Sequence, residues 1–570
     1  MSHSSSSPQP LAGAADSESL HSTAAQNEKT QLPSPVELDT FLSGKKLAVV
    51  FVAMMLSMFL TALDQTILAT ALPRIASDFE SFSLQGWVSS AFILAQAVFL
   101  LFYGQLLRIL PAKWVLISSI TIFEAGSLLC GVSQNIDQLI AGRTVSGLGA
   151  AGISAFPRGN VYFDLTSLPP VVAMIQVIAQ TTRLQDRPKL FGMFGALFGL
   201  ASVVGPLIGG GLTDHVTWRW CFWINLPFGG VSVCGVLFMV KAAPPLGSDP
   251  TKRSNRDIFQ QILRMDYVGA TLIAGAVTTL VLALQWGGNT KPWSDKAVII
   301  CFVFAAVLTA VFIGWESYMG DRAMAPTTIF KSRSIYSLLS YSFLSRFSLL
   351  IYSYYIPIFY QASRGHSATK SGLDLLPFML GVVVTVLAAG QIVSRTGRYW
   401  SFLVVAPVFL AIGSGLLYTL TPSTSSAKLV GFQILAGVGI GMGMQNALLA
   451  IQVEFKDEKK LLAQAMSMST FSQFLGGTIG LAIAEPVFAT NLAKKLARYA
   501  PDAPAAIVKE SPTAIFSGAL PKEMIAGVVR SYTESLRIVF VLGVPVAGLA
   551  LLSTLMIKNI RIETGAKGVH

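Results

Sequence analysis

The chain has 570 residues, of which 53% are hydrophobic and only 12% are charged. Soluble globular domains carry roughly 25% charged residues, so this composition excludes an ordinary soluble protein and indicates an integral membrane protein. The formal net charge of +12 comes from short basic clusters between apolar runs. Such clusters are typical of membrane topology signals and not of a nucleic-acid-binding surface.

The N-terminal part of the chain divides into a polar tail and a run of apolar segments. Residues 1–46 are rich in Ser, Pro, Ala, Gln and Glu and lack the short apolar core of a signal peptide, so we expect a disordered cytosolic tail. Residues 47–241 predict a bundle of six membrane-spanning helices, because each apolar run is long enough to cross a bilayer. The six runs lie near residues 48–71, 87–107, 114–132, 138–182, 190–212 and 220–241.

The rest of the chain predicts two extra helices and a second bundle. Residues 242–335 contain a polar cytosolic linker and two apolar runs, near 267–286 and 297–315. Residues 336–557 predict a C-terminal six-helix bundle with one long outer loop at 491–533. The apolar runs of this bundle lie near residues 336–360, 373–393, 401–420, 428–451, 464–488 and 536–557. Residues 558–570 are expected to form a cytosolic tail. The predicted fold is therefore an all-α polytopic membrane protein of about 14 spans, since continuous apolar runs exclude a barrel.

The distribution of Lys and Arg sets the expected orientation. Basic residues gather in alternate short loops, such as the one holding Arg183, Arg187 and Lys189, and the intervening short loops hold few. Because basic loops stay on the cytosolic side, both termini are predicted to face the cytosol.

The fourth apolar run, 138–182, is more than twice the length that a bilayer needs, and Pro169 and Pro170 interrupt it. Splitting it into two spans would leave a piece too short to cross and would turn the later basic loops outward. Removing residues 156–172 restores one span of ordinary length. Our hypothesis is that this insertion is a translated unspliced segment; the alternative is a genuine re-entrant or cytosolic loop.

Asp64 is the first candidate for chemistry, because it lies inside the first span, about 12 Å from the outer end of the helix. A carboxylate at such a depth costs roughly 2.5–3.5 kcal/mol on insertion scales, which makes it a functional candidate for proton coupling. The alternative is a neutral carboxyl group that is hydrogen-bonded to a neighbouring helix.

Arg143 in the fourth span is expected at a depth similar to that of Asp64, so the two side chains are able to pair. The alternative is that its long side chain extends to the outer surface. Glu124, near the middle of the third span, is either a further protonation site or a carboxylic acid that only packs.

The second half of the chain supplies candidates for contact with a substrate. Arg346 lies deep in the ninth span, where it either binds a substrate or anchors helices. Gln445 and Gln473, in the twelfth and thirteenth spans, are the other polar residues that we assign to a possible substrate cavity.

Other motifs are excluded or are structural. Residues 147–152 match the dinucleotide fingerprint G-x-G-x-x-G, but they lie inside a predicted membrane helix and follow no strand. The sequence contains no G-x-x-x-x-G-K-[ST] phosphate loop and no Cys pair with metal-ligand spacing. We therefore expect no catalytic residues, no metal and no cofactor.

Several motifs together resemble the major facilitator superfamily, and specifically its fungal fourteen-span drug:proton antiporters. They are L-D-Q-T-I at 63–67, A-G-R-T-V-S-G-L-G at 141–149, G-P-L-I-G-G at 205–210, W-R-W-C-F-W-I-N-L-P at 218–227 and Y-Y-I-P-I-F-Y-Q at 354–361. The resemblance covers nearly all of residues 45–560. It implies a fold of two six-helix bundles plus two central extra helices, from which the insertion 156–172 in span four departs.

The resemblance also implies roles for particular residues. The Gly-Pro element of span five marks antiporters in this family, which points to Gly205, Pro206, Gly209 and Gly210, and the Arg of span four is implicated in proton coupling. Where the family usually has Gln three positions after that Arg, this chain has Ser146.

The expected function is proton-coupled efflux of an amphipathic organic compound, such as a toxin, secondary metabolite or drug, by alternating access. An uptake carrier for a small organic solute and a non-transporting sensor of the same fold are the alternatives. We expect a monomer in the plasma membrane, with the vacuolar membrane as the other candidate location. Its partners would be the substrate, protons and lipid, with no nucleic acid.

Overall fold

The computed structural model describes most of the chain as helices. The described residues are 45–79, 85–154, 197, 200–201, 204–205, 208–213, 215–239, 255–288, 291–320, 323–455, 459–504, 508, 515–516 and 520–561. Within them the elements are all helical, and ten helices are long and apolar enough to span a membrane. The predicted helical membrane fold is confirmed, whereas the count of 14 spans stays a prediction, because much of spans four and five lies outside these ranges.

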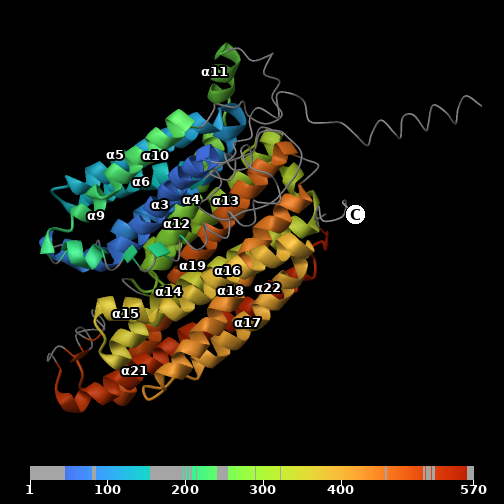
Figure 1. The fold of residues 1–570 in the computed structure, drawn as a ribbon. Helices are drawn as coiled ribbons and strands as arrows, with labels where there is room; N and C mark the ends of the chain where they lie inside the picture. The colour runs from blue at the N-terminus through green and yellow to red at the C-terminus, as the bar shows by residue number, and fades with distance from the viewer. Residues whose placement is uncertain are drawn as a thin grey trace, which may run out of the picture. The chain divides into compact units, whose positions relative to one another are not determined.

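The N-terminal bundle is built from helices that pack side by side in Figure 1. They are α3 (Lys45–Asp78), α4 (Gln85–Ile109), α5 (Ala112–Gly131), α6 (Ile136–Ser154), α9 (Trp220–Trp223) and α10 (Asn225–Met239). α6 packs against both α4 and α5, and α10 packs against both α3 and α5. The bundle therefore brings α3, α4, α6 and α10 around the region where Asp64 and Arg143 were expected.

The extra helices form a separate pair, α12 (Tyr267–Trp286) and α13 (Lys296–Met319), after the short helix α11 (Asn255–Leu263). Two carboxylates explain where they start: Asp266 accepts from the Gly269 N–H at 2.7 Å and Asp295 accepts from the Ala297 N–H at 2.8 Å. α12 also packs against α4 and against α19 (Lys459–Tyr499), so the pair contacts both bundles.

The C-terminal bundle contains the remaining long helices, coloured yellow to red in Figure 1. They are α14 (Arg333–Arg364), α15 (Ala368–Asp374), α16 (Leu376–Thr396), α17 (Trp400–Tyr418), α18 (Ser426–Glu454), α19, α21 (Lys522–Val541) and α22 (Gly543–Thr554). α18 lies between α16 and α17, and α14 packs along α19. Gly437 and Gly441 permit the close approach of α18 to α16, since a Cβ at either would lie within 2.4 Å of an α16 carbonyl oxygen.

Residues 491–533, expected as an outer loop, differ from that description at both ends. α19 continues to Tyr499 and α21 begins at Lys522. Leu492 and Leu496 of α19 are buried in one apolar cluster with Val528 and Tyr532 of α21. Burial of these side chains explains why the helices extend past the apolar runs that predicted them.

The proposed insertion, 156–172, lies outside the described residues. α6 is described as far as Ser154, and the next described residue is Leu197.

Candidate functional site

The structure brings Asp64 of α3 and Arg143 of α6 together in a buried ion pair. Arg143 Nη1 lies 2.6 Å from Asp64 Oδ2, and each residue is only 1% exposed. Each charge offsets part of the free-energy cost of burying the other in this apolar bundle. The Arg143 side chain therefore does not extend to the surface. Asp64 has the Arg143 guanidinium as its partner, and not only an uncharged group on a neighbouring helix.

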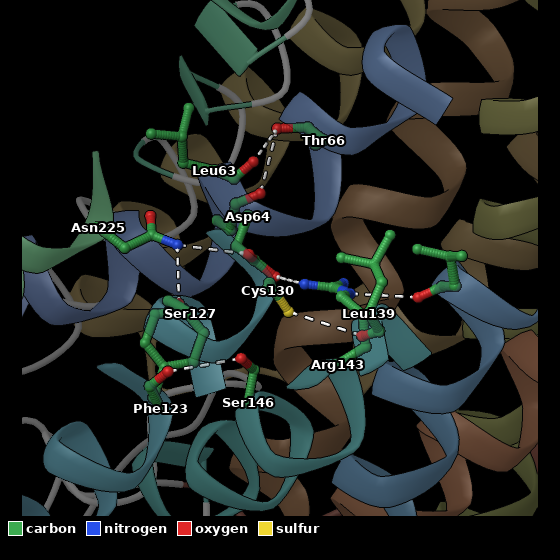
Figure 2. A network of polar contacts seen from close by, with 12 residues as sticks. Leu63, Asp64, Thr66, Phe123, Ser127, Cys130, Leu139, Arg143, Ser146 and Asn225 are labelled. Carbon is green, nitrogen blue, oxygen red and sulfur yellow. Dashed lines mark hydrogen bonds and ion pairs between the residues drawn. The ribbon is translucent and has the colours of Figure 1, made fainter. Parts of the chain in front are cut away.

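Two further helices hold the pair in place. The Arg143 Nε–H donates to the Val88 carbonyl oxygen of α4 at 3.2 Å, and the guanidinium lies 4.3 Å from the centre of the Phe92 ring. Asn225, at the start of α10, donates from Nδ2 to Asp64 Oδ1 at 3.4 Å. The pair thus links α3, α4, α6 and α10. Figure 2 shows the contacts of Asp64 with Arg143 and Asn225.

Asn225 and Ser127 belong to this network, although the sequence analysis assigned neither a role. Asn225 Nδ2 also contacts Ser127 Oγ of α5 at 3.2 Å (Figure 2). Both residues are buried. The signal that could have identified Asn225 is an uncharged polar residue at the start of an otherwise apolar span, within W-R-W-C-F-W-I-N-L-P.

Glu124 lies on α5, which carries neither residue of the ion pair. Its two carboxyl oxygens are buried, and within the described residues neither has a hydrogen-bond partner. The carboxyl group sits against Gly229 of α10, where a Cβ would lie 1.9 Å from Glu124 Oε1. It is also close enough to Asp64 for two negative charges to repel each other.

The Gly-Pro element is only partly described. A Cβ on Gly205 would lie 2.1 Å from Thr66 Oγ1, so glycine permits this close approach to α3. Thr66 Oγ1 in turn donates to the Ala201 carbonyl oxygen at 2.9 Å. Gly209 is buried and Gly210 half-buried, and Pro206 lies outside the described residues.

The three residues assigned to a substrate cavity lie in the C-terminal bundle, apart from the ion pair. Arg346 of α14 is 7% exposed and lies 5.8 Å from the centre of the Phe474 ring of α19. Gln445 of α18 and Gln473 of α19 are also buried. Within the described part of the chain, neither polar atom of the Gln473 side chain has a hydrogen-bond partner.

The family model for the major facilitator superfamily matches residues 54–158 and 167–481. This match covers most of the chain, and with the fold it shows that the chain belongs to this superfamily of membrane transporters. Residues 159–166, where the match is interrupted, fall inside the segment 156–172 that the sequence marks as an insertion.

Fungal transporters are similar to this chain over nearly its whole length. The MFS-type efflux pump MFS1 of Trichophyton rubrum is 35% identical, covering 92% of this chain and 94% of the relative. The MFS-type transporter astH of Aspergillus oryzae is 34% identical over 97% and 93%, and the efflux pump hmp6 of Hypomyces subiculosus is 38% identical over 85% and 82%. The chain is therefore a membrane transporter and not an enzyme.

A solved structure supports the fold alone. The bacterial homologue of the human lysosomal transporter Spinster, in an inward-facing and unoccupied conformation, superposes with a TM-score of 0.55 at 12% sequence identity. The superposition covers 90% of this chain and 98% of that protein.

If the ion pair stabilises the bundle, the effect on stability of substituting one of its residues should depend on whether the other is present. Arg143→Gln alone should destabilise the protein by about 3–5 kcal/mol, because it leaves the Asp64 charge buried and unpaired. The double variant Asp64→Asn/Arg143→Gln should recover much of this loss. The measurement is a double-mutant cycle of thermal stability in detergent, and additive effects of the two substitutions would contradict the pairing.

Proposed function

We propose that this transporter couples the inward movement of protons to the outward movement of an amphipathic organic compound across the plasma membrane. The observation that carries the proposal is the buried ion pair between Asp64 and Arg143, which is linked to four helices of one bundle. An ionisable residue inside a membrane span is a functional candidate because burying it is costly.

Protonation of Asp64 would change this site in a defined way. A neutral Asp64 no longer attracts the Arg143 guanidinium, which would keep its contacts with the Val88 carbonyl and the Phe92 ring of α4. Asp64 would keep Asn225 of α10 as its partner. The proton would therefore weaken the connection between α3 and α6 and leave the other contacts in place, which favours a rearrangement of the bundle.

The outward direction is supported by relatives that are named efflux pumps. We assign contact with the substrate to Arg346, Gln445 and Gln473. Gln473 is the strongest of these, since a buried amide without a partner in the described residues offers both a donor and an acceptor to a ligand. A cation beside the Phe474 ring suits a planar or electron-rich group. We further propose a monomer with both termini in the cytosol, as the basic loops favour.

Transport driven by a pH gradient tests the coupling directly. In proteoliposomes screened with antifungals and secondary metabolites, Asp64→Asn and Arg143→Ala should lower pH-driven transport by about tenfold or more, equivalent to about 1.4 kcal/mol or more. Asp137→Asn is the matched control, because Asp137 is an exposed carboxylate in the first turn of the same helix as Arg143 and should leave transport unchanged.

Unchanged proton-dependent transport in both Asp64→Asn and Arg143→Ala would refute their coupling roles. Accumulation of substrate in cells that express the protein would contradict efflux and support uptake as the direction of transport. No flux of any compound would favour a sensor of the same fold.

We also propose that residues 156–172 are a translated unspliced segment. The interruption of the family match at 159–166 supports this proposal, because the match resumes immediately beyond it. Deleting residues 156–172 should raise delivery to the plasma membrane and pH-driven efflux, since span four regains an ordinary length. Peptides from the native protein that cross this segment, together with full activity of the intact chain, would contradict the proposal.

A further inference from the structure

A second buried acidic site lies where α12 begins and α13 ends, away from the pair formed by Asp64 and Arg143. Asp266 immediately precedes α12 and Glu316 lies in the last turn of α13. They are 1% and 4% exposed, so both carboxyl groups are shielded from water almost completely. Neither residue has a place in the proposed transport mechanism.

One oxygen of each carboxyl group has a structural role. Asp266 Oδ1 accepts from the Gly269 N–H and from the Trp315 Nε1–H, both at 2.7 Å. Glu316 Oε2 accepts from the Ala325 N–H at 2.7 Å. These bonds fix where both carboxyl groups lie.

The remaining two oxygens lie beside each other above Gly269. A Cβ at Gly269 would be 2.3 Å from Asp266 Oδ2 and 2.8 Å from Glu316 Oε1. The two oxygens therefore lie close to the same point of α12. Within the described residues, neither of these oxygens has a donor. Because ionised carboxylates only accept, this contact becomes a hydrogen bond only if one of the two groups carries a proton.

Among the described residues, no ion pair offsets two negative charges at this site. Within the described ranges, no Lys or Arg forms an ion pair with Asp266 or Glu316. Arg264 is exposed, and the Tyr267 hydroxyl donates to the Ile262 carbonyl oxygen. Among the described side chains, Gln105 of α4 accepts from the Asp266 N–H, and Gln464 of α19 donates to the Ala323 carbonyl oxygen nearby; both are uncharged amides. Two adjacent carboxylates cannot both ionise easily in such a setting.

We propose that Asp266 and Glu316 share one proton and form a second proton-binding site, which joins the extra helices to both bundles. The connection to the N-terminal bundle is the Asp266 N–H, which donates to Gln105 Oε1 of α4 at 3.1 Å. The connection to the C-terminal bundle is the segment that contains Ala325. Gln464 Nε2 of α19 donates to the Ala323 carbonyl oxygen of this segment at 2.9 Å.

The shared proton holds these connections together. While it is bound, Asp266 and Glu316 attract each other and the start of α12 stays against the end of α13. When the pH rises and the proton leaves, the two carboxylates repel each other, which favours separation of the start of α12 from the end of α13. The stabilisation is therefore present at low pH and is lost as the pH rises.

Infrared difference spectroscopy of the full-length protein in nanodiscs tests this site without any transported compound. The C=O stretch of a protonated carboxyl group should titrate with pH, and one such band should be lost in both Asp266→Asn and Glu316→Gln. Each amide keeps an oxygen acceptor, so the helix contacts are retained. Asp295→Asn is the matched control, because Asp295 caps the other end of α13 and forms no carboxyl pair; it should leave the band unchanged.

A reference variant guards against loss of folding in the two test proteins. Asp64→Asn/Glu124→Gln/Arg143→Gln removes the buried carboxyl groups of the N-terminal bundle together with the Arg143 charge that Asp64 pairs with, and leaves the Asp266 and Glu316 pair intact. The absence of any protonated carboxyl band in this variant at every pH would overturn the proposal, as would a band that persists in both Asp266→Asn and Glu316→Gln. Neither result depends on proton-coupled efflux, so the two proposals fail separately.

Discussion

The buried ion pair between Asp64 and Arg143 constrains how the helices of the N-terminal bundle pack. Two buried charges are tolerated only because they lie 2.6 Å apart, and this requires α3 and α6 to keep their relative position. The Val88 carbonyl oxygen and Asn225 extend the same constraint to α4 and α10. A change in the charge of one carboxyl group therefore affects four helices together.

Close packing by glycine makes this geometry possible. A Cβ at Gly142 would lie 2.7 Å from Cys130 Sγ, and a Cβ at Gly126 would lie 2.4 Å from Ser146 Oγ. α5 and α6 consequently approach each other closely beside the ion pair. Ser146, which stands where the family usually has Gln, is a small residue that fits this space. The small side chains leave little room for water, which strengthens the interaction between the charges.

Apolar runs and their punctuation predicted the helices of the second half well, because length and charge alone fix where a chain crosses a bilayer. The run 267–286 matches α12, which Asp266 caps and Gly287 ends. The depth of Asp64 and Arg143 in their spans predicted that they are able to pair. Contacts between helices distant in sequence, such as Asn225 with Asp64 and Asp266 with Glu316, were not predicted, because a sequence pattern gives the depth of a residue but not its neighbours.

In the proposed mechanism Asp64 carries the coupling proton, while the rest of the transporter performs the conformational cycle. Substrate–substrate exchange across a proteoliposome membrane needs that cycle but no net proton movement. Asp64→Asn should therefore keep exchange near the native rate and lose net pH-driven efflux of the same compound. Equal loss of exchange and net efflux, or retention of both, would contradict this mechanism.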